Sequence, residues 1–222
     1  MLRIGLPAGG EFALMFIYLA VIFLIMRDFG SQAQAGFGVG SRVMQAVFLP
    51  AMAVAFAAAP IAGQNIGAGK TERAEATFNW AAVMGSAMML ALTVLCQFRG
   101  DLFVRAFTKD AAVIAVGAQF LQIISWNFVA QGIIFTCSGM FQALGNTVPA
   151  MISSGTRVVT FAVPAIWLSH VTGYELRQLW HLSVATVTLQ MCVSVLLLRR
   201  EWQRKLRMAS APATQGVGTM RA

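Results

Sequence analysis

The sequence predicts an all-α fold, that of a polytopic membrane protein with six transmembrane helices. Of its 222 residues, 58% are apolar and only 11% are charged. A soluble domain is about a quarter charged, and a disordered chain needs low hydrophobicity, so the composition argues against both classes. The apolar residues also gather in runs of about 20 residues or more, the length at which a helix crosses a bilayer.

Three spans are expected in the first half of the chain, over 4–26, 33–62 and 79–97. The first carries Pro7 in its opening turn, where a missing N–H costs little, and it ends at the turn over 27–30. The second begins with closely spaced glycines and continues through Pro50. A loop rich in glycine and charge, over 63–78, separates the second span from the third.

Three more spans are expected in the second half, over 112–137, 148–169 and 176–198. An uncharged segment over 138–147 separates the first two of these, and Pro164 lies inside the second. Arginines and lysines follow the last span at once. We therefore divide the chain into a six-helix transmembrane lobe over 1–200 and a basic cytoplasmic tail over 201–222, which is predicted to be disordered.

Six spans place both ends of the chain on one side of the membrane. With the ends in the cytoplasm, that side carries the larger set of basic residues: Arg3, Lys70, Arg73, Arg199, Arg200, Arg204, Lys205, Arg207 and Arg221. The opposite loops carry Arg27, Arg99, Arg105, Lys109 and Arg177. The positive-inside rule thus predicts cytoplasmic termini in a cell membrane, and we expect a bacterial inner membrane. The net charge of +8 is then explained by this bias and by membrane lipid, not by nucleic acid.

Three charged residues fall inside expected spans: Glu11, Arg42 and Arg157. A charge in a span costs about 2.5–3.5 kcal/mol on insertion scales, so each is predicted to face protein or a water-filled cavity. Helical spacing extends these positions into polar stripes along neighbouring faces. We expect a substrate or cation cavity lined by Glu11, Tyr18, Arg42, Asn127, Gln131 and Arg157.

Structural explanations compete with this cavity. Further polar stripes, at Ser153 and Thr160 and at Ser183, Thr186, Gln190 and Ser194, can be interhelical hydrogen bonds. Glu11 can form an ion pair with Arg42 or Arg157. Pro50 and Pro164 each remove a backbone hydrogen bond in mid-span, which predicts a kink and a point of conformational change. The pairs Gly5/Gly9 and Gly36/Gly40 match the G-x-x-x-G spacing that lets helices approach closely.

Enzyme chemistry finds little support in the sequence. No catalytic triad, carboxylate pair or metal-ligand cluster occurs, so we expect no enzyme activity and no cofactor. The segment from Gly63 to Thr71 resembles a phosphate-binding loop, but Gln64 replaces a required glycine and no strand precedes it. Cys96, Cys137 and Cys192 are far apart and are expected to be inert core thiols.

Three motifs occur in a fixed order along the chain: Gly5-Leu6-Pro7-Ala8, Gly63-Gln64-Asn65-Ile66-Gly67-Ala68-Gly69 and Phe141-Gln142-Ala143-Leu144-Gly145-Asn146. Arg157 and Pro164 follow in the fifth span. This set resembles the multidrug and toxic compound extrusion (MATE) family, over about residues 1–200. Family members have twelve helices in two six-helix lobes, and the resemblance implies that this chain is the C-terminal lobe.

The resemblance also implies a function. Family members exchange sodium ions or protons for cationic, amphipathic drugs, so Na⁺ or H⁺ is the expected coupling ion. In one branch, a Glu and an Asp of this lobe are implicated in coupling, but those positions fall at Phe16 and near Gln131 here. The expected partners are membrane lipid, a drug substrate, and a missing N-terminal lobe or a second copy of the chain. Alternatives are a flippase for lipid or lipid-linked oligosaccharide, and a truncated remnant that transports nothing.

Overall fold

A computed structural model of the chain describes residues 2–169 and 175–210, and these residues are almost entirely helical. Long apolar runs form helices because backbone groups in lipid must find their hydrogen bonds within their own segment. In chain order the elements are α1 (Leu2–Met26), the 3-10 helix η1 (Arg27–Phe29), α2 (Ser31–Gly67), α3 (Thr71–Arg105), α4 (Ala111–Ile124), α5 (Asn127–Ala143), α6 (Val148–Ser169) and α7 (Leu176–Ser210). The all-α prediction is confirmed.

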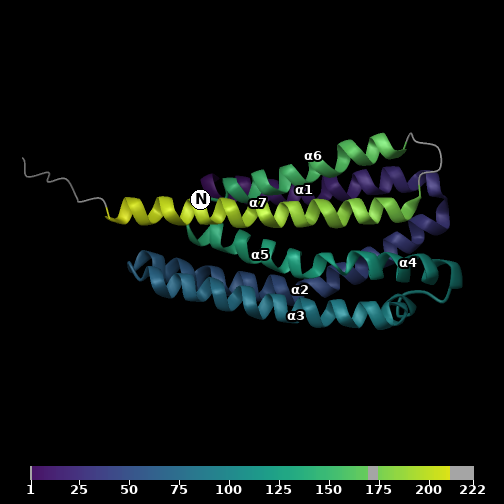
Figure 1. The fold of residues 1–222 in the computed structure, drawn as a ribbon, viewed down its shortest axis with the longest axis horizontal. Coiled ribbons are helices and arrows are strands. Elements are labelled where there is room, and N and C mark those ends of the chain that lie inside the picture. The colour runs from purple at the N-terminus through teal and green to yellow at the C-terminus, as the bar shows by residue number, and fades with distance from the viewer. Residues whose placement is uncertain (1, 170–174, 211–222) are drawn as a thin grey trace, which may run out of the picture.

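The helices have the lengths and compositions of membrane spans. Five of the described helices, α1, α2, α3, α6 and α7, are each long and apolar enough to cross a bilayer, and α4 and α5, taken together as one bent span, are a sixth candidate. Figure 1 shows both ends of the described chain at the same end of the bundle, as an even number of crossings requires. Trp80, Phe98 and Trp167 are exposed on the outside of the bundle, as expected where lipid surrounds a protein.

The hairpin of α2 and α3 is longer than the sequence predicts. The two helices meet in a tight turn at Ala68–Lys70, in which Gly69 has a φ of +72°, so the prediction of a loop over 63–78 is wrong. α2 has 37 residues and is therefore about 55 Å long, whereas a hydrocarbon core is about 30 Å thick. Hydropathy marks only the part of a helix that lies in lipid, and the polar end of α2 and the charged start of α3 continue beyond it.

α7 also continues past its expected end. It reaches Ser210, so the segment 201–210 is helical and the prediction of a tail disordered from residue 201 is corrected there. An ion pair of 3.5 Å between the exposed Arg204 and the partly buried Glu201 joins adjacent turns of this extension. The remainder of the expected tail, 211–222, lies outside the described residues, and the division into a lobe and a tail stays a prediction.

The fourth expected span, over 112–137, is two helices rather than one. α4 and α5 meet at an angle of 59°. Side chains of α3 bind the backbone at the break: Gln97 Nε2 donates to the carbonyl of Gln122 at 2.7 Å, and Thr93 Oγ1 donates to that of Ser125 at 2.9 Å. Neither glycine nor proline lies at the break, so the sequence pattern reads as one continuous span.

The helices form two groups with a cavity between them. α1, α6 and α7 make up one group and α2, α3, α4 and α5 the other, and α7 packs against both α6 and α5 and so joins the groups (Figure 1). α1 and α2 have little direct contact. Side chains of both helices instead line an open cavity, whose back wall is formed by α5 and α7.

One of the two expected glycine pairs has the predicted effect. Gly36 and Gly40 of α2 pack against α4, and a Cβ added at Gly36 would lie 2.7 Å from Val116 Cβ. At Gly5 and Gly9 an added Cβ would meet nothing within 4 Å. The close approach predicted from G-x-x-x-G spacing is therefore confirmed for the pair in α2, whereas the pair in α1 contacts no described neighbour at this distance.

Candidate functional site

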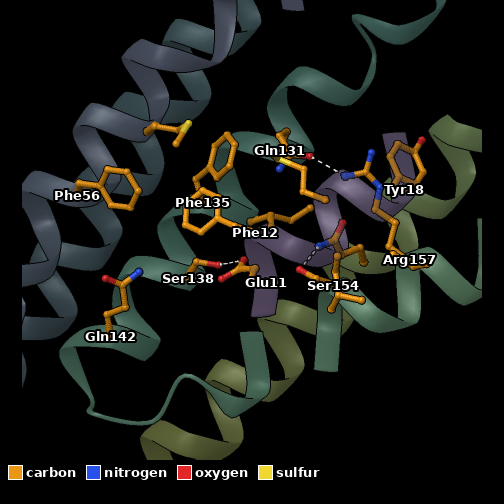
Figure 2. A pocket seen from close by; sticks show the side chains of 16 residues that line it. Glu11, Phe12, Tyr18, Phe56, Gln131, Phe135, Ser138, Gln142, Ser154 and Arg157 are labelled. Carbon is orange, nitrogen blue, oxygen red and sulfur yellow. Dashed lines mark hydrogen bonds between the residues drawn. The ribbon is translucent and has the colours of Figure 1, made fainter. Parts of the chain in front are cut away.

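Two adjoining cavities lie between the helix groups. The first is polar and has a volume of about 70 Å³, enough for several water molecules. Its polar lining residues are Glu11, Tyr18, Gln131, Ser138, Gln142, Ser154, Arg157 and Gln190 (Figure 2). The second is largely apolar, has a volume of about 280 Å³ and shares Tyr18, Gln131 and Arg157 with the first. Four of the six predicted cavity residues line the polar cavity together.

Glu11 is partly buried on the cavity face of α1. Its carboxylate accepts a hydrogen bond of 2.6 Å from the hydroxyl of Ser138 on α5, and Figure 2 shows the two side chains pointing at each other. No ion pair of Glu11 occurs among the described residues. The alternative in which Arg42 or Arg157 neutralises this carboxylate is therefore not what the structure contains.

Arg157 reaches the cavity from the middle of α6. Its guanidinium lies over the ring of Tyr18, with 4.0 Å from Cζ to the ring centroid, and Nη1 donates to Gln131 Oε1 at 3.4 Å. Tyr18 is fixed in turn, because its hydroxyl hydrogen-bonds to Ser183 at 2.7 Å and its ring packs on Phe161 at 4.7 Å. The cation is thus held by neutral groups, an aromatic face and an amide oxygen.

The predicted polar stripes of α5 and α7 face the inside of the bundle. All of the following are buried: Asn127, Gln131, Ser138, Ser183, Thr186, Gln190 and Ser194. Part of this set is packing, as the alternative interpretation predicts, because Ser153 and Ser194 hydrogen-bond at 2.5 Å between α6 and α7. Asn127 lines the apolar cavity, and its Oδ1 is buried without a partner among the described residues.

Arg42 is the predicted cavity residue that the structure does not bring to the others. It is exposed on α2 and lines neither cavity. Phe37, Met44 and Phe48 carry the cavity face of this helix, and Arg42 is rotated by about 140° from Phe37. The sequence identified the cost of this charge but not the face of the helix on which it lies.

The lining also includes residues that the sequence did not single out. Ser154 accepts a hydrogen bond of 3.2 Å from Gln190 Nε2, and Gln142 closes the polar cavity near the end of α5. Ser154 lies three residues before Arg157 and so on the same helical face, which means that helical spacing could have suggested it. The aromatic walls, such as Phe135, carry no such signal because an apolar residue looks the same in lipid, core and cavity.

The two prolines predicted as points of conformational change lie in continuous helices. α2 continues through Pro50 and α6 through Pro164. Non-helical dihedral angles occur instead inside α3, at Arg99, where φ is −137°. The role of the two prolines in bending stays a prediction.

The chemistry available in the polar cavity is that of one carboxylate and one guanidinium. Among the described residues, no group of three or more His, Cys, Asp or Glu side chains is placed to hold a metal ion. Carboxylates inside spans are the groups through which pumps and transporters pass protons. The carboxylate of Glu11 therefore offers oxygen atoms to a proton or a small cation, and Arg157 offers N–H donors to an anionic or polar group.

Comparison with known proteins finds a matching family model and several curated relatives. The family model MatE matches residues 7–168. The chain is 27% identical to the probable multidrug resistance protein YpnP of Bacillus subtilis over 151 residues, which cover 68% of this chain and 34% of that protein. It is 25% identical to the multidrug export protein MepA of Staphylococcus haemolyticus over 187 residues, which cover 82% of this chain and 40% of that protein.

Solved structures of transporters share the fold. A crystal structure of MATE in the bent conformation superposes with a TM-score of 0.86 at 20% identity, covering 94% of this chain and 46% of that one. An outward-facing MATE family transporter of the MOP superfamily gives a TM-score of 0.81 at 21% identity, covering 92% of this chain and 46% of that one. The chain thus spans less than half the length of the relatives that it matches.

Proposed function

This chain belongs to the MatE family, and from that premise we propose that it is one six-helix lobe of a secondary antiporter for multiple drugs. The transporter exports cationic or amphipathic drugs and takes up Na⁺ or H⁺ in exchange. The chain covers 34% and 40% of two curated relatives, so the cavity is completed by a second lobe. That lobe is an N-terminal six-helix unit or a second copy of this chain, with the termini in the cytoplasm of a bacterial cell.

One observation carries the proposal: the carboxylate of Glu11 lies inside a membrane span and faces the polar cavity without an ionic partner among the described residues. Such a charge costs about 2.5–3.5 kcal/mol to place in a span. A coupling cation that binds at the carboxylate of Glu11 offsets this cost whenever the site is occupied. Glu11 is therefore the coupling carboxylate, and Tyr18, Gln131 and Arg157 are its neighbours in the cavity.

The flippase alternative receives no such support. It needs a strongly basic cavity for a pyrophosphate, which the sequence could build only from Arg42 and Arg157. Arg42 is exposed on α2 and lines neither cavity. A single guanidinium facing a carboxylate in one cavity suits a drug antiporter better than a pyrophosphate carrier.

The test is drug efflux from proteoliposomes under imposed sodium or pH gradients. The chain is reconstituted alone and joined to a second six-helix lobe, and Glu11→Gln is compared with the unmodified chain. We expect Glu11→Gln to lower gradient-driven efflux at least tenfold. Glu75→Gln is the matched control because Glu75 is exposed on α3, and it should change efflux less than twofold. Efflux and cation dependence that survive Glu11→Gln would overturn the assignment.

A further inference from the structure

Arg157 carries a positive charge that the described part of the chain leaves without a counterion. We propose that this guanidinium binds the anionic group of an amphipathic ligand whose apolar part fills the adjoining cavity. The inference rests on the proposed drug transport and deepens it. Among the amphipathic drugs of the proposed function, it identifies those with a carboxylate, sulfonate or phosphate, including zwitterionic ones, as a class of substrate.

The donors of Arg157 are only partly used. Nη1 makes one long hydrogen bond of 3.4 Å to Gln131, and Nε is buried with no acceptor among the described residues. Arginine keeps its charge in proteins, and its planar fork of donors fits carboxylates and phosphates with two bonds at once. A buried donor left unpaired is unfavourable, and an anionic ligand offers acceptors to the donors that the protein leaves unused.

Tyr18 holds this guanidinium in position for a ligand. The ring that Arg157 covers is anchored by Ser183 through its hydroxyl and by Phe161 through a tilted ring contact. A fixed aromatic platform limits the rotamers of the arginine, so less entropy is lost when it binds. The guanidinium also lines both cavities, which places its charge at the border between polar and apolar walls.

The apolar cavity fits the body of an amphiphile. Its volume of about 280 Å³ approaches the lower limit of ligand pockets, about 300 Å³. Its walls include Met15, Met52, Phe48 and Phe135, and flexible methionines let such a site accept several shapes. An anionic head at Arg157 would leave the rest of the molecule against these walls.

The anionic site and the carboxylate are separated along α1. Glu11 lies two helical turns before Tyr18 on the same face, so their backbone positions are about 10 Å apart along the axis of α1. Glu11 points at Ser138, whereas Arg157 lies against Tyr18 and Gln131 (Figure 2). A coupling cation and the anionic head of a substrate therefore have separate places in one cavity.

Binding of two matched fluorescent probes tests this inference. The chain is placed in phosphatidylcholine nanodiscs and titrated with anilinonaphthalene sulfonate and with N-phenylnaphthylamine, its neutral analogue, against empty nanodiscs. The unmodified chain should bind the sulfonate at least tenfold more tightly than the neutral probe. Arg157→Gln should weaken sulfonate binding at least tenfold and neutral binding less than twofold, and Arg157→Lys should keep part of the sulfonate affinity.

Arg42→Gln is the matched control, because it removes a span arginine that lies outside both cavities. It should leave the affinity for both probes unchanged. Equal losses for both probes in Arg157→Gln, or no preference for the sulfonate in the unmodified chain, would overturn the inference. The preference of the unmodified chain for the sulfonate is measured without any variant, so this test remains valid even if Arg157→Gln does not fold.

Two further arms complete the experiment. Nanodiscs that contain phosphatidylglycerol distinguish the source of the anion. If this lipid competes with the sulfonate probe, and the competition disappears in Arg157→Gln, the anion is a lipid headgroup. If the lipid does not compete with the probe, the anion belongs to a soluble amphiphile. The efflux assay with cationic drugs separates this inference from the proposed function. Efflux that continues without any sulfonate binding rejects the anionic site alone, whereas sulfonate binding without cation-driven efflux rejects antiport alone.

Discussion

The hydroxyl of Ser138 donates a hydrogen bond of 2.6 Å to the carboxylate of Glu11, and this bond joins α5 to α1 across the polar cavity. Most of the packing of α1 is against α6. Polar contacts hold it to the rest of the bundle, since Tyr18 bonds Ser183 on α7 and the Ile4 carbonyl accepts from Thr147 at 2.8 Å. The same contacts that position α1 therefore also shape the candidate cation site.

Ser138→Ala should change the cation dependence of transport. The Ser138 hydroxyl competes with a coupling cation for the same carboxylate oxygen. A hydrogen bond to a charged group contributes about 1.5–3 kcal/mol. Removing it should lower the cation concentration that gives half-maximal efflux by about tenfold, with the maximal rate changed much less. Efflux at a series of sodium or proton concentrations measures both quantities.

Ser154→Ala is the control for that measurement. Ser154 lines the same cavity, but it accepts its hydrogen bond from Gln190. The half-maximal cation concentration should shift less than twofold in this variant. An equal shift in both serine variants would show that the cavity responds to any lost hydroxyl, and the specific link between Ser138 and Glu11 would be rejected.

Tyr18→Phe should destabilise the bundle by about 1 kcal/mol, because the variant loses the hydrogen bond to Ser183 and keeps the ring under Arg157. A double-mutant cycle with Ser183→Ala isolates the hydrogen bond. The double variant should lose less stability than the sum of the losses in the two single variants. Additive losses would contradict a direct interaction between the two hydroxyls.

Thiol accessibility provides the stability measurement. Cys96 and Cys137 are buried, as the sequence predicts, whereas Cys192 is exposed and corrects the expectation of a core thiol. In a Cys192→Ser background, a maleimide dye reacts only as the bundle opens. The midpoint of this reaction on heating then reports the unfolding of the helices that contain the two buried thiols.

Much of the fold follows from the sequence because lipid imposes simple rules on it. Apolar length predicted the spans, and α6 begins and ends at the expected residues. The break between α4 and α5 was missed because neither glycine nor proline marks it, and the contacts at the break come from another helix, where Thr93 and Gln97 of α3 bind the carbonyls. Helix ends beyond the membrane were missed because a charged helix and a charged loop have similar compositions.

The candidate site was predictable to the extent that charge in a span is costly. That cost selected Glu11 and Arg157, and helical spacing added Tyr18 and Gln131 to the same cavity. The cost also selected Arg42, which is exposed elsewhere on the bundle surface. Spacing along one helix gives the relative positions of its residues but not the direction in which the helix faces its neighbours.

Gly139→Ala should destabilise the packing of α5 on α2. A Cβ added at Gly139 would lie 2.8 Å from the carbonyl oxygen of Ala55, a backbone atom that cannot rotate away. Overpacking of this kind costs about 1–3 kcal/mol. Gly38→Ala is the matched control, since an added Cβ there meets nothing within 4 Å. The thiol assay should show a lower midpoint for Gly139→Ala and an unchanged or higher one for Gly38→Ala, and equal midpoints would contradict the packing.

Thr93→Val tests whether α3 holds the break between α4 and α5. The Thr93 hydroxyl lies 2.9 Å from the carbonyl oxygens of both Met89, in its own helix, and Ser125, at the break. Valine keeps the shape of threonine and removes the donor. Hydrogen bonds between membrane helices contribute about 0.6 kcal/mol on average and about 1.7 kcal/mol at most, so we expect a loss in this range.

Thr188→Val is the control for the loss of stability in Thr93→Val. Thr188 is exposed on α7, and its hydroxyl bonds only the carbonyl of Val184, one turn earlier in the same helix. Both variants lose a bond within a helix, but only Thr93→Val also loses the contact with the break. A larger drop in the thermal midpoint for Thr93→Val therefore measures how much the contact from α3 stabilises the bend. Equal drops would mean that α4 and α5 set their angle of 59° without help from Thr93.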